Sequence, residues 1–127
     1  MPLTTVGRNW IAQAIINDSA PTHFDNSNAY LGSGNSNTAF DAAQTDLQGG
    51  SKLRRGMEAT YPQRTDNVIS FRSLFGTGDA NWAWNEWCVA NHATAGVMLS
   101  RKVESLGTKA ATQSWLLDVT LTVQIGS

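Results

Sequence analysis

Cys88 and His92 are the two side chains whose types and spacing could support nucleophilic catalysis by a thiol. Such catalysis needs the base in hydrogen-bond contact with the sulfur, and a third group that orients the base. Cys88 lies inside a predicted strand over 84–90, whereas His92 begins the following turn. A lone cysteine in such a place most often serves as a small buried hydrophobe. The pattern therefore favours a structural role and makes a thiol enzyme the weakest functional hypothesis.

Two glycine-rich loops, 32–34 and 76–78, resemble phosphate-binding loops only superficially. Neither precedes a predicted helix with a following lysine, as nucleotide-binding motifs require. The acidic residues lack the spacing of a calcium loop. His23 and His92 have no framework of cysteines or carboxylates around them, as a zinc site would need. We therefore expect no catalytic residues, no cofactor and no metal.

Glu86 is the carboxylate with the most unusual predicted surroundings, because it sits between Trp84 and Trp87. An unpaired charge among aromatic side chains is costly. Glu86 could act as a general acid in a cleft, or it could form an ion pair with a neighbouring strand or subunit. The ion pair is the favoured interpretation. Its candidate partners within the chain are Arg54, Arg55 and Arg72.

The tryptophans of the same segment, Trp82, Trp84 and Trp87, form the second cluster of interest. Aromatic rings grouped in a polar stretch can stack on sugar rings, which keeps a carbohydrate-binding module open. Tryptophans are equally the anchor residues of protein interfaces. In a regular strand Trp84 and Trp87 fall on opposite faces, which splits a stacking platform. We therefore treat Trp82, Trp84, Glu86 and Trp87 as candidate interface residues.

The composition of the 127-residue, 13.7 kDa chain limits the classes of function. A net charge of −1 provides no field that would attract nucleic acid. No apolar run approaches the roughly 20 residues of a membrane span, and a single cysteine excludes an internal disulfide. We expect neither nucleic acid nor membrane as a partner. Only 15% of the residues are charged and five are tryptophan, so we expect a homo-oligomer or assembly into something larger.

The elements that would position these side chains begin with a helix over about 4–17, whose apolar residues recur at helical spacing. Thr4 or Thr5 can cap it. A short strand is predicted over 29–31, followed by a turn-rich loop over 32–37 and a short helical turn over 39–45.

The second half of the chain changes to the period of two that is typical of strands. Strands are predicted over 52–61, with a bulge near Gly56, and over 67–75, 84–90 and 97–105. The pattern indicates one domain over 1–127, with strands mainly in 52–125. The fold class is mainly β (α+β), an antiparallel β-sandwich or barrel with an N-terminal helix.

The C-terminal segment 115–125 shows the clearest alternation in the sequence. Its apolar series should be buried, and its polar series should be exposed or hydrogen-bonded at an interface. Thr120 and Thr122 in the polar series are further candidate interface residues. The apolar series is Trp115, Leu117, Val119, Leu121, Val123 and Ile125, and the polar series is Asp118, Thr120, Thr122 and Gln124.

Several motifs together resemble small virion proteins of tailed phages. The first is Leu31-Gly32-Ser33-Gly34-Asn35-Ser36-Asn37-Thr38-Ala39-Phe40, followed by Gln44-Thr45-Asp46-Leu47. The later ones are Val68-Ile69-Ser70-Phe71-Arg72-Ser73-Leu74-Phe75-Gly76, Ala80-Asn81-Trp82-Ala83-Trp84-Asn85-Glu86-Trp87 and Gly96-Val97-Met98-Leu99-Ser100-Arg101. The match covers roughly residues 4–125 and is similar to domains of the capsid decoration and tail-collar-fibre types.

This resemblance implies a non-enzymatic virion component that assembles in the host cytoplasm. Its partners would be other virion proteins, either the major capsid protein or tail proteins. The short chain fits a capsid decoration (cement) protein, and the alternative is a tail-fibre, collar or baseplate component. A carbohydrate-binding module is the alternative of another class.

Overall fold

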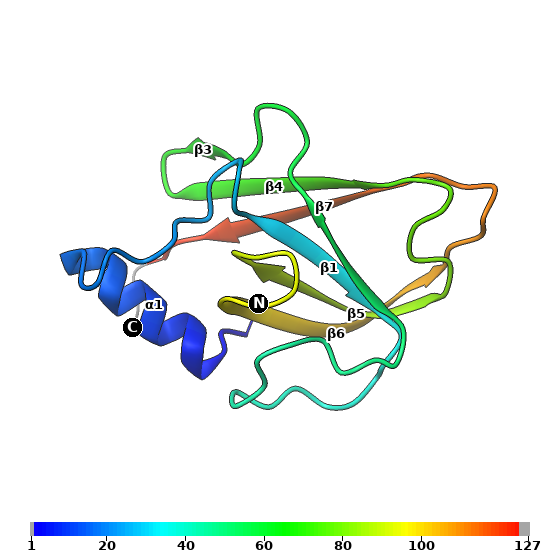
Figure 1. The fold of residues 1–127 in the computed structure, drawn as a ribbon, viewed down its shortest axis with the longest axis horizontal. Helices are drawn as coiled ribbons and strands as arrows, with labels where there is room; N and C mark the ends of the chain where they lie inside the picture. The colour runs from blue at the N-terminus through cyan, green and yellow to red at the C-terminus, as the bar shows by residue number, and fades with distance from the viewer. Residues whose placement is uncertain (1, 125–127) are drawn as a thin grey trace.

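The computed structural model describes residues 2–124, which form two antiparallel sheets and one N-terminal helix (Figure 1). The sheets have the strand orders β2-β1-β5-β6 and β3-β4-β7 and are not closed into a barrel. This confirms the predicted α+β class and selects the sandwich over the barrel. The elements are α1 (Thr5–Ile16), β1 (Tyr30–Gly34), β2 (Lys52–Gly56), β3 (Gln63–Thr65), β4 (Val68–Phe75), β5 (Ala83–Ala90), β6 (Met98–Thr108) and β7 (Trp115–Thr122).

Helix α1 begins where the sequence predicts and is attached to the sandwich mainly by its first turn. The Thr4 hydroxyl accepts a hydrogen bond from the Gly7 amide at 2.9 Å, which caps the helix. Gly7 is the only buried residue of α1, and an added Cβ there would lie 2.3 Å from the Leu99 carbonyl oxygen. The helix backbone therefore comes very close to β6 in this turn, and Ile11 of a later turn packs half-buried against the core. Ile15, one of the apolar residues that recur at helical spacing, is 78% exposed.

Strand β1 differs most from its prediction, because the glycine-serine run belongs to the strand and not to a loop. β1 pairs with β2 on one side and β5 on the other, so it lies inside the four-stranded sheet. The glycines admit side chains from β5: an added Cβ at Gly32 would lie 2.7 Å from the Cys88 sulfur. Glycine inside a strand marks such close approaches.

The first predicted strand of the second half, 52–61, ends earlier than expected. β2 stops at Gly56 where a bulge was predicted, and the chain passes to the three-residue β3 in the other sheet. The alternation predicted for β4 is confirmed, since Phe71, Ser73 and Phe75 are buried. The interior of the sandwich is aromatic where the two sheets meet.

Strand β7 confirms the predicted alternation only in its first part. Leu117 and Val119 are buried, and Thr120 and Thr122 are exposed. Leu121 is half-buried and Val123, beyond the end of the strand, is 64% exposed. The prediction that these two are buried is wrong, because the core covers Leu121 only in part and Val123 lies beyond the last residue of the strand. Ile125 lies outside the described residues.

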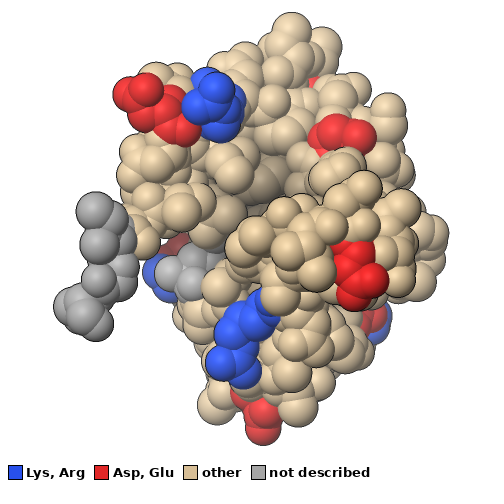
Figure 2. All heavy atoms as spheres, turned by 90° about the vertical axis from the view of Figure 1, so that its left-hand side faces the viewer, with Lys and Arg blue, Asp and Glu red and all other residues tan. Residues whose placement is uncertain are grey.

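Residues 35–51 connect β1 to β2 without any helix or strand. Of the helical turn predicted over 39–45, one hydrogen-bonded turn is present, in which the Gln44 amide donates to the Asp41 carbonyl oxygen at 3.0 Å. Other backbone groups of the segment bond to side chains, and the Ala42 carbonyl oxygen accepts from the Thr5 amide of α1 at 2.8 Å. In Figure 1 this segment runs below β5 and β6. We call residues 35–51 the cover loop. Figure 2 shows one side of the molecule, on which the few charged side chains are scattered.

Candidate functional site

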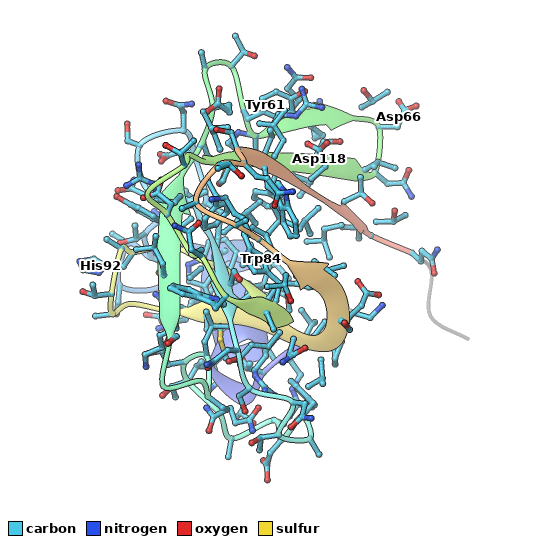
Figure 3. The ribbon with its side chains drawn as sticks, turned by 90° about the vertical axis from the view of Figure 1, so that its right-hand side faces the viewer. Tyr61, Asp66, Trp84, His92 and Asp118 are labelled. Atoms are coloured by element: carbon cyan, nitrogen blue, oxygen red, sulfur yellow. The ribbon has the colours of Figure 1, made fainter. Side chains whose placement is uncertain are left out.

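Trp84 lies in the interior of the sandwich, as Figure 3 shows. Its ring meets Phe75 and Trp115 edge-on, with centroids 4.8 and 5.0 Å away. Its indole nitrogen donates to the Ala80 carbonyl oxygen at 2.9 Å. Trp84 therefore belongs to the core, and the prediction of an accessible interface residue is wrong at this position.

Trp87 and Trp82 complete the tryptophan cluster. Trp84 and Trp87 both pack into the main core cluster, because the register of β5 against β6 shifts between Trp84 and Glu86. A β-bulge of this kind re-aims side chains, so the opposite faces expected for a regular strand do not occur. Trp87 is buried and Trp82 is half-buried. The three rings therefore do not form an exposed stacking platform.

Glu86 is fully buried and forms an ion pair with Arg101, whose Nε lies 2.8 Å from the carboxylate. The favoured ion pair is thus present, but the three arginines named as candidate partners are wrong. Arg101 lies on β6, next to β5 in the sheet, and its side chain is also completely buried. A fully buried charge requires both a partner and hydrogen bonds on its remaining polar atoms.

The Glu86 carboxylate obtains those hydrogen bonds from the cover loop. The backbone amides of Gln48 and Gly49 donate to it at 2.8 and 2.7 Å, and that of Ser36 at 3.3 Å. An added Cβ at Gly34 would lie 2.2 Å from the same carboxylate. Because residue 34 is glycine, the Glu86 carboxylate can lie against the backbone of β1.

Arg101 holds the other half of the cover loop. Its guanidinium donates to the Thr38 carbonyl oxygen at 2.9 Å and to the Gln44 side-chain oxygen at 3.1 Å. Together Glu86 and Arg101 attach both arms of an irregular segment to the outer face of a sheet. We call this arrangement the buried clamp. Its geometry is that of a structural support, because each polar atom of the pair faces the protein.

A second charged group lies beside the cover loop. Asp46 contacts Arg54 at 3.0 Å and Lys52 at 2.7 Å, and Arg54 donates to the carbonyl oxygens of His92 and Ala95, both at 2.9 Å. Burial raises the pKa of Asp46, but the bonds from Lys52 and Leu47 and the charges of Arg54 and Lys52 outweigh it, so the net pKa is lowered. A hollow of about 320 Å³ opens beside this group.

Cys88 and His92 do not form a catalytic pair in this arrangement. Cys88 is completely buried, which confirms its predicted structural place. Burial raises the pKa of the Cys88 thiol to about 12, and a thiol without thiolate character is a poor nucleophile. His92 lies at the periphery (Figure 3), where its Nδ1 accepts from the amides of Thr94 and Ala95 at 3.1 and 2.9 Å.

Thr120 and Thr122 lie on the exposed side of β7, where the prediction placed them. Asp118 on the same side pairs with Arg72 of β4, and Arg72 in turn lies 4.8 Å from the ring centre of Tyr61. Among residues 2–124, no three histidine, cysteine or acidic side chains gather as a metal site would require. No helix in this range is long and apolar enough to span a membrane.

Sequence reasoning missed two buried cations, Arg101 and Lys109. The Lys109 ammonium donates to the Gly76 carbonyl oxygen at 2.6 Å and to the Asn81 side chain at 2.8 Å. A signal for Arg101 exists in the sequence. A symmetric hairpin about the loop 91–96 places Glu86 opposite Arg101, close to the observed register.

Comparison with known proteins gives no family for this chain. It matches no protein-family model, and no curated protein matches it significantly.

Proposed function

We propose that this chain is a non-enzymatic structural protein of a tailed-phage particle, and that it acts as a capsid decoration protein. In this role it binds the major capsid protein and stabilises the particle by covering joints between capsid subunits. The proposal rests on two observations. One is the sequence resemblance, and the other is the structural role of the residues in the resembling motifs.

The observation that carries the proposal is the buried clamp. The resemblance segments 31–40, 44–47, 80–87 and 96–101 meet there, through Thr38, Gln44, Glu86 and Arg101. The charged groups that could have done chemistry are engaged in holding the cover loop. These residues fix the conformation of a surface loop. A binding protein needs such a loop, since loops on a rigid scaffold carry recognition.

The character of the surface also supports assembly. Charged residues make up 15% of the chain, well below the roughly 25% of an average domain. Large apolar side chains are exposed, among them Ile15, Ile16, Leu116 and Val123. A surface with few charges favours association with other molecules, because charge is the main device that keeps a protein dispersed. The alternative of a sugar-binding platform loses its support, because Trp84 and Trp87 are buried.

Particles of a tailed phage that encodes the chain provide the test. We expect mass spectrometry of gradient-purified particles to detect the chain, and a cryo-electron microscopy map to place it on the capsid lattice. Density on the tail would instead support the fibre, collar or baseplate role. Absence of the chain from purified particles would contradict both.

A deletion provides the functional measurement. Particles that lack the chain should release DNA at a lower temperature than intact particles, because the joints between capsid subunits are uncovered. Addition of the purified chain should restore the release temperature, whereas an unrelated protein of similar mass should not. Equal release temperatures for intact and deleted particles would contradict the stabilising role.

A further inference from the structure

The four outer edges of the two sheets are protected very unequally. Exposed strand edges invite pairing with other chains, and proteins blunt them with charge, short length or a covering segment. β2 carries three basic residues among its five, and β3 is only three residues long. The edge of β6 is bridged by Leu3, which pairs with Ser100. β7 is eight residues long and carries a single charged residue, Asp118.

The open edge of β7 presents main-chain donors and acceptors. Val123 donates to the Asn67 carbonyl oxygen at 2.9 Å, which fixes the pairs that are hydrogen-bonded to β4. Because these pairs alternate along an antiparallel ladder, the intervening residues direct their N–H and C=O groups outward. Within residues 2–124 no hydrogen bond reaches these outward groups. The outward residues are Leu116, Asp118, Thr120 and Thr122.

The two ends of β7 are complementary to each other. At its start a hollow of about 460 Å³ is lined by the apolar side chains of Leu106, Trp115, Leu116 and Leu117 and by the polar residues Ser114 and Asp118. At its end Val123 projects an apolar side chain into solvent. An antiparallel copy of the strand would bring the projecting side chain of one molecule to the hollow of the other.

We propose that two copies of this chain pair through β7, antiparallel and centred on Val119. In this register every outward group of one strand meets one of the other, which gives about eight main-chain hydrogen bonds. The partner's Val123 lies opposite Trp115, and the partner's Leu121 lies opposite Leu117. The half-buried end of the apolar series thereby becomes covered.

The outer face agrees with the same register. Asp118 lies opposite the partner's Thr120, and Leu116 lies opposite the partner's Thr122, so no like charges face each other. Pairing centred on Asp118 would place two aspartates directly opposite, which is unfavourable. The two three-stranded sheets then join into one continuous sheet of six strands.

Sedimentation velocity of the isolated chain over a micromolar concentration series tests the proposal. The wild type should form a dimer. Val123→Asp should raise the dimer dissociation constant at least about tenfold, because it places a charge against the partner's Trp115. Thr120→Pro should do the same, because it removes an outward N–H that the β4–β7 ladder does not use.

Ile15→Asp is the matched control. It introduces the same charge at another exposed apolar side chain, on α1, which packs against β6 and not against β7, so the dimer should be unchanged. Circular dichroism of each variant establishes that it is folded. A wild-type chain that stays monomeric overturns the proposal. So does a folded Val123→Asp variant that dimerises as strongly as the Ile15→Asp variant.

This inference is independent of the phage role. Self-association is measured on the isolated chain, whereas the proposed function is measured on particles, so either can fail alone.

Discussion

Replacement of Arg101 by methionine removes the countercharge of the buried Glu86 carboxylate while it keeps a side chain of similar length. Removal of one partner from a buried ion pair costs about 3–5 kcal/mol. Three backbone amides still donate to the carboxylate in this variant. We therefore expect a cost at the lower end, about 3 kcal/mol of unfolding free energy.

Glu86→Gln leaves the opposite defect. Arg101 stays cationic and fully buried, and a donor replaces one of its acceptor atoms, so we expect the upper end, about 5 kcal/mol. The double variant holds no unpaired charge, and its remaining cost is that of backbone amides left without an acceptor, about 1–3 kcal/mol each. The double variant should therefore cost clearly less than the sum of the two single variants.

Urea unfolding of the wild type and the three variants gives these free energies. Arg72→Met is the matched control, because Arg72 also pairs with a carboxylate, that of Asp118, but on the exposed face of β4. Its midpoint should shift far less than that of Arg101→Met. Native-state hydrogen exchange adds a local measurement: the amides of 36–49 should exchange faster in Arg101→Met.

Two results would refute the reasoning. Equal shifts for the buried and the exposed arginine would mean that burial of the pair has no energetic weight. Strict additivity in the double variant would mean that Glu86 and Arg101 do not stabilise each other.

Three further predictions follow from single positions. Gly34→Ala should destabilise the fold strongly, since its Cβ would lie 2.2 Å from a buried oxygen, whereas Gly50→Ala has nothing within 4 Å and should be near neutral in thermal unfolding. Leu117→Ala should cost about 2–5 kcal/mol and Thr122→Ala less than about 1 kcal/mol, and equal urea midpoints would contradict the one-sided strand. Burial raises the Cys88 pKa from 9.0 to about 12, so the folded thiol keeps its proton where the unfolded chain loses it. The stability that this provides should fall as the pH rises from 9 towards 12, and thiol reagents near neutral pH should label only the unfolded chain.

The sequence predicts those elements whose side chains alternate between an apolar interior and water. β4 and the first part of β7 are of this kind, because burial on one face determines which residues suit each position. Helix α1 is predicted by its cap and spacing, but not its exposure. A periodic pattern shows which face can be buried and does not show how much of it a neighbour covers.

The predictions fail where contacts between distant segments decide the structure. The run 32–34 has the composition of a turn, yet it lies inside a sheet. Its glycines lack a Cβ, and the side chains of Cys88 and Glu86 occupy the volume that a Cβ would fill. The cover loop has no pattern of its own, since its order comes from the buried clamp. Composition alone does not distinguish Arg54, Arg55 and Arg72 from Arg101 as the partner of Glu86, whereas hairpin symmetry about 91–96 points to Arg101.

The cap of helix α1 has a consequence for synthesis of the chain. The Thr4 hydroxyl that caps the helix also donates to the Met98 carbonyl oxygen, 94 residues later. At a translation rate of roughly 5–20 residues per second, the helix waits roughly 5–20 seconds for the strand that anchors it. The cover loop likewise lacks its hydrogen bonds from Arg101 until that residue has been synthesised. A nascent chain therefore carries an unanchored helix α1 and an unanchored cover loop until β6 has left the ribosome, and fragments that end before β6 should not fold.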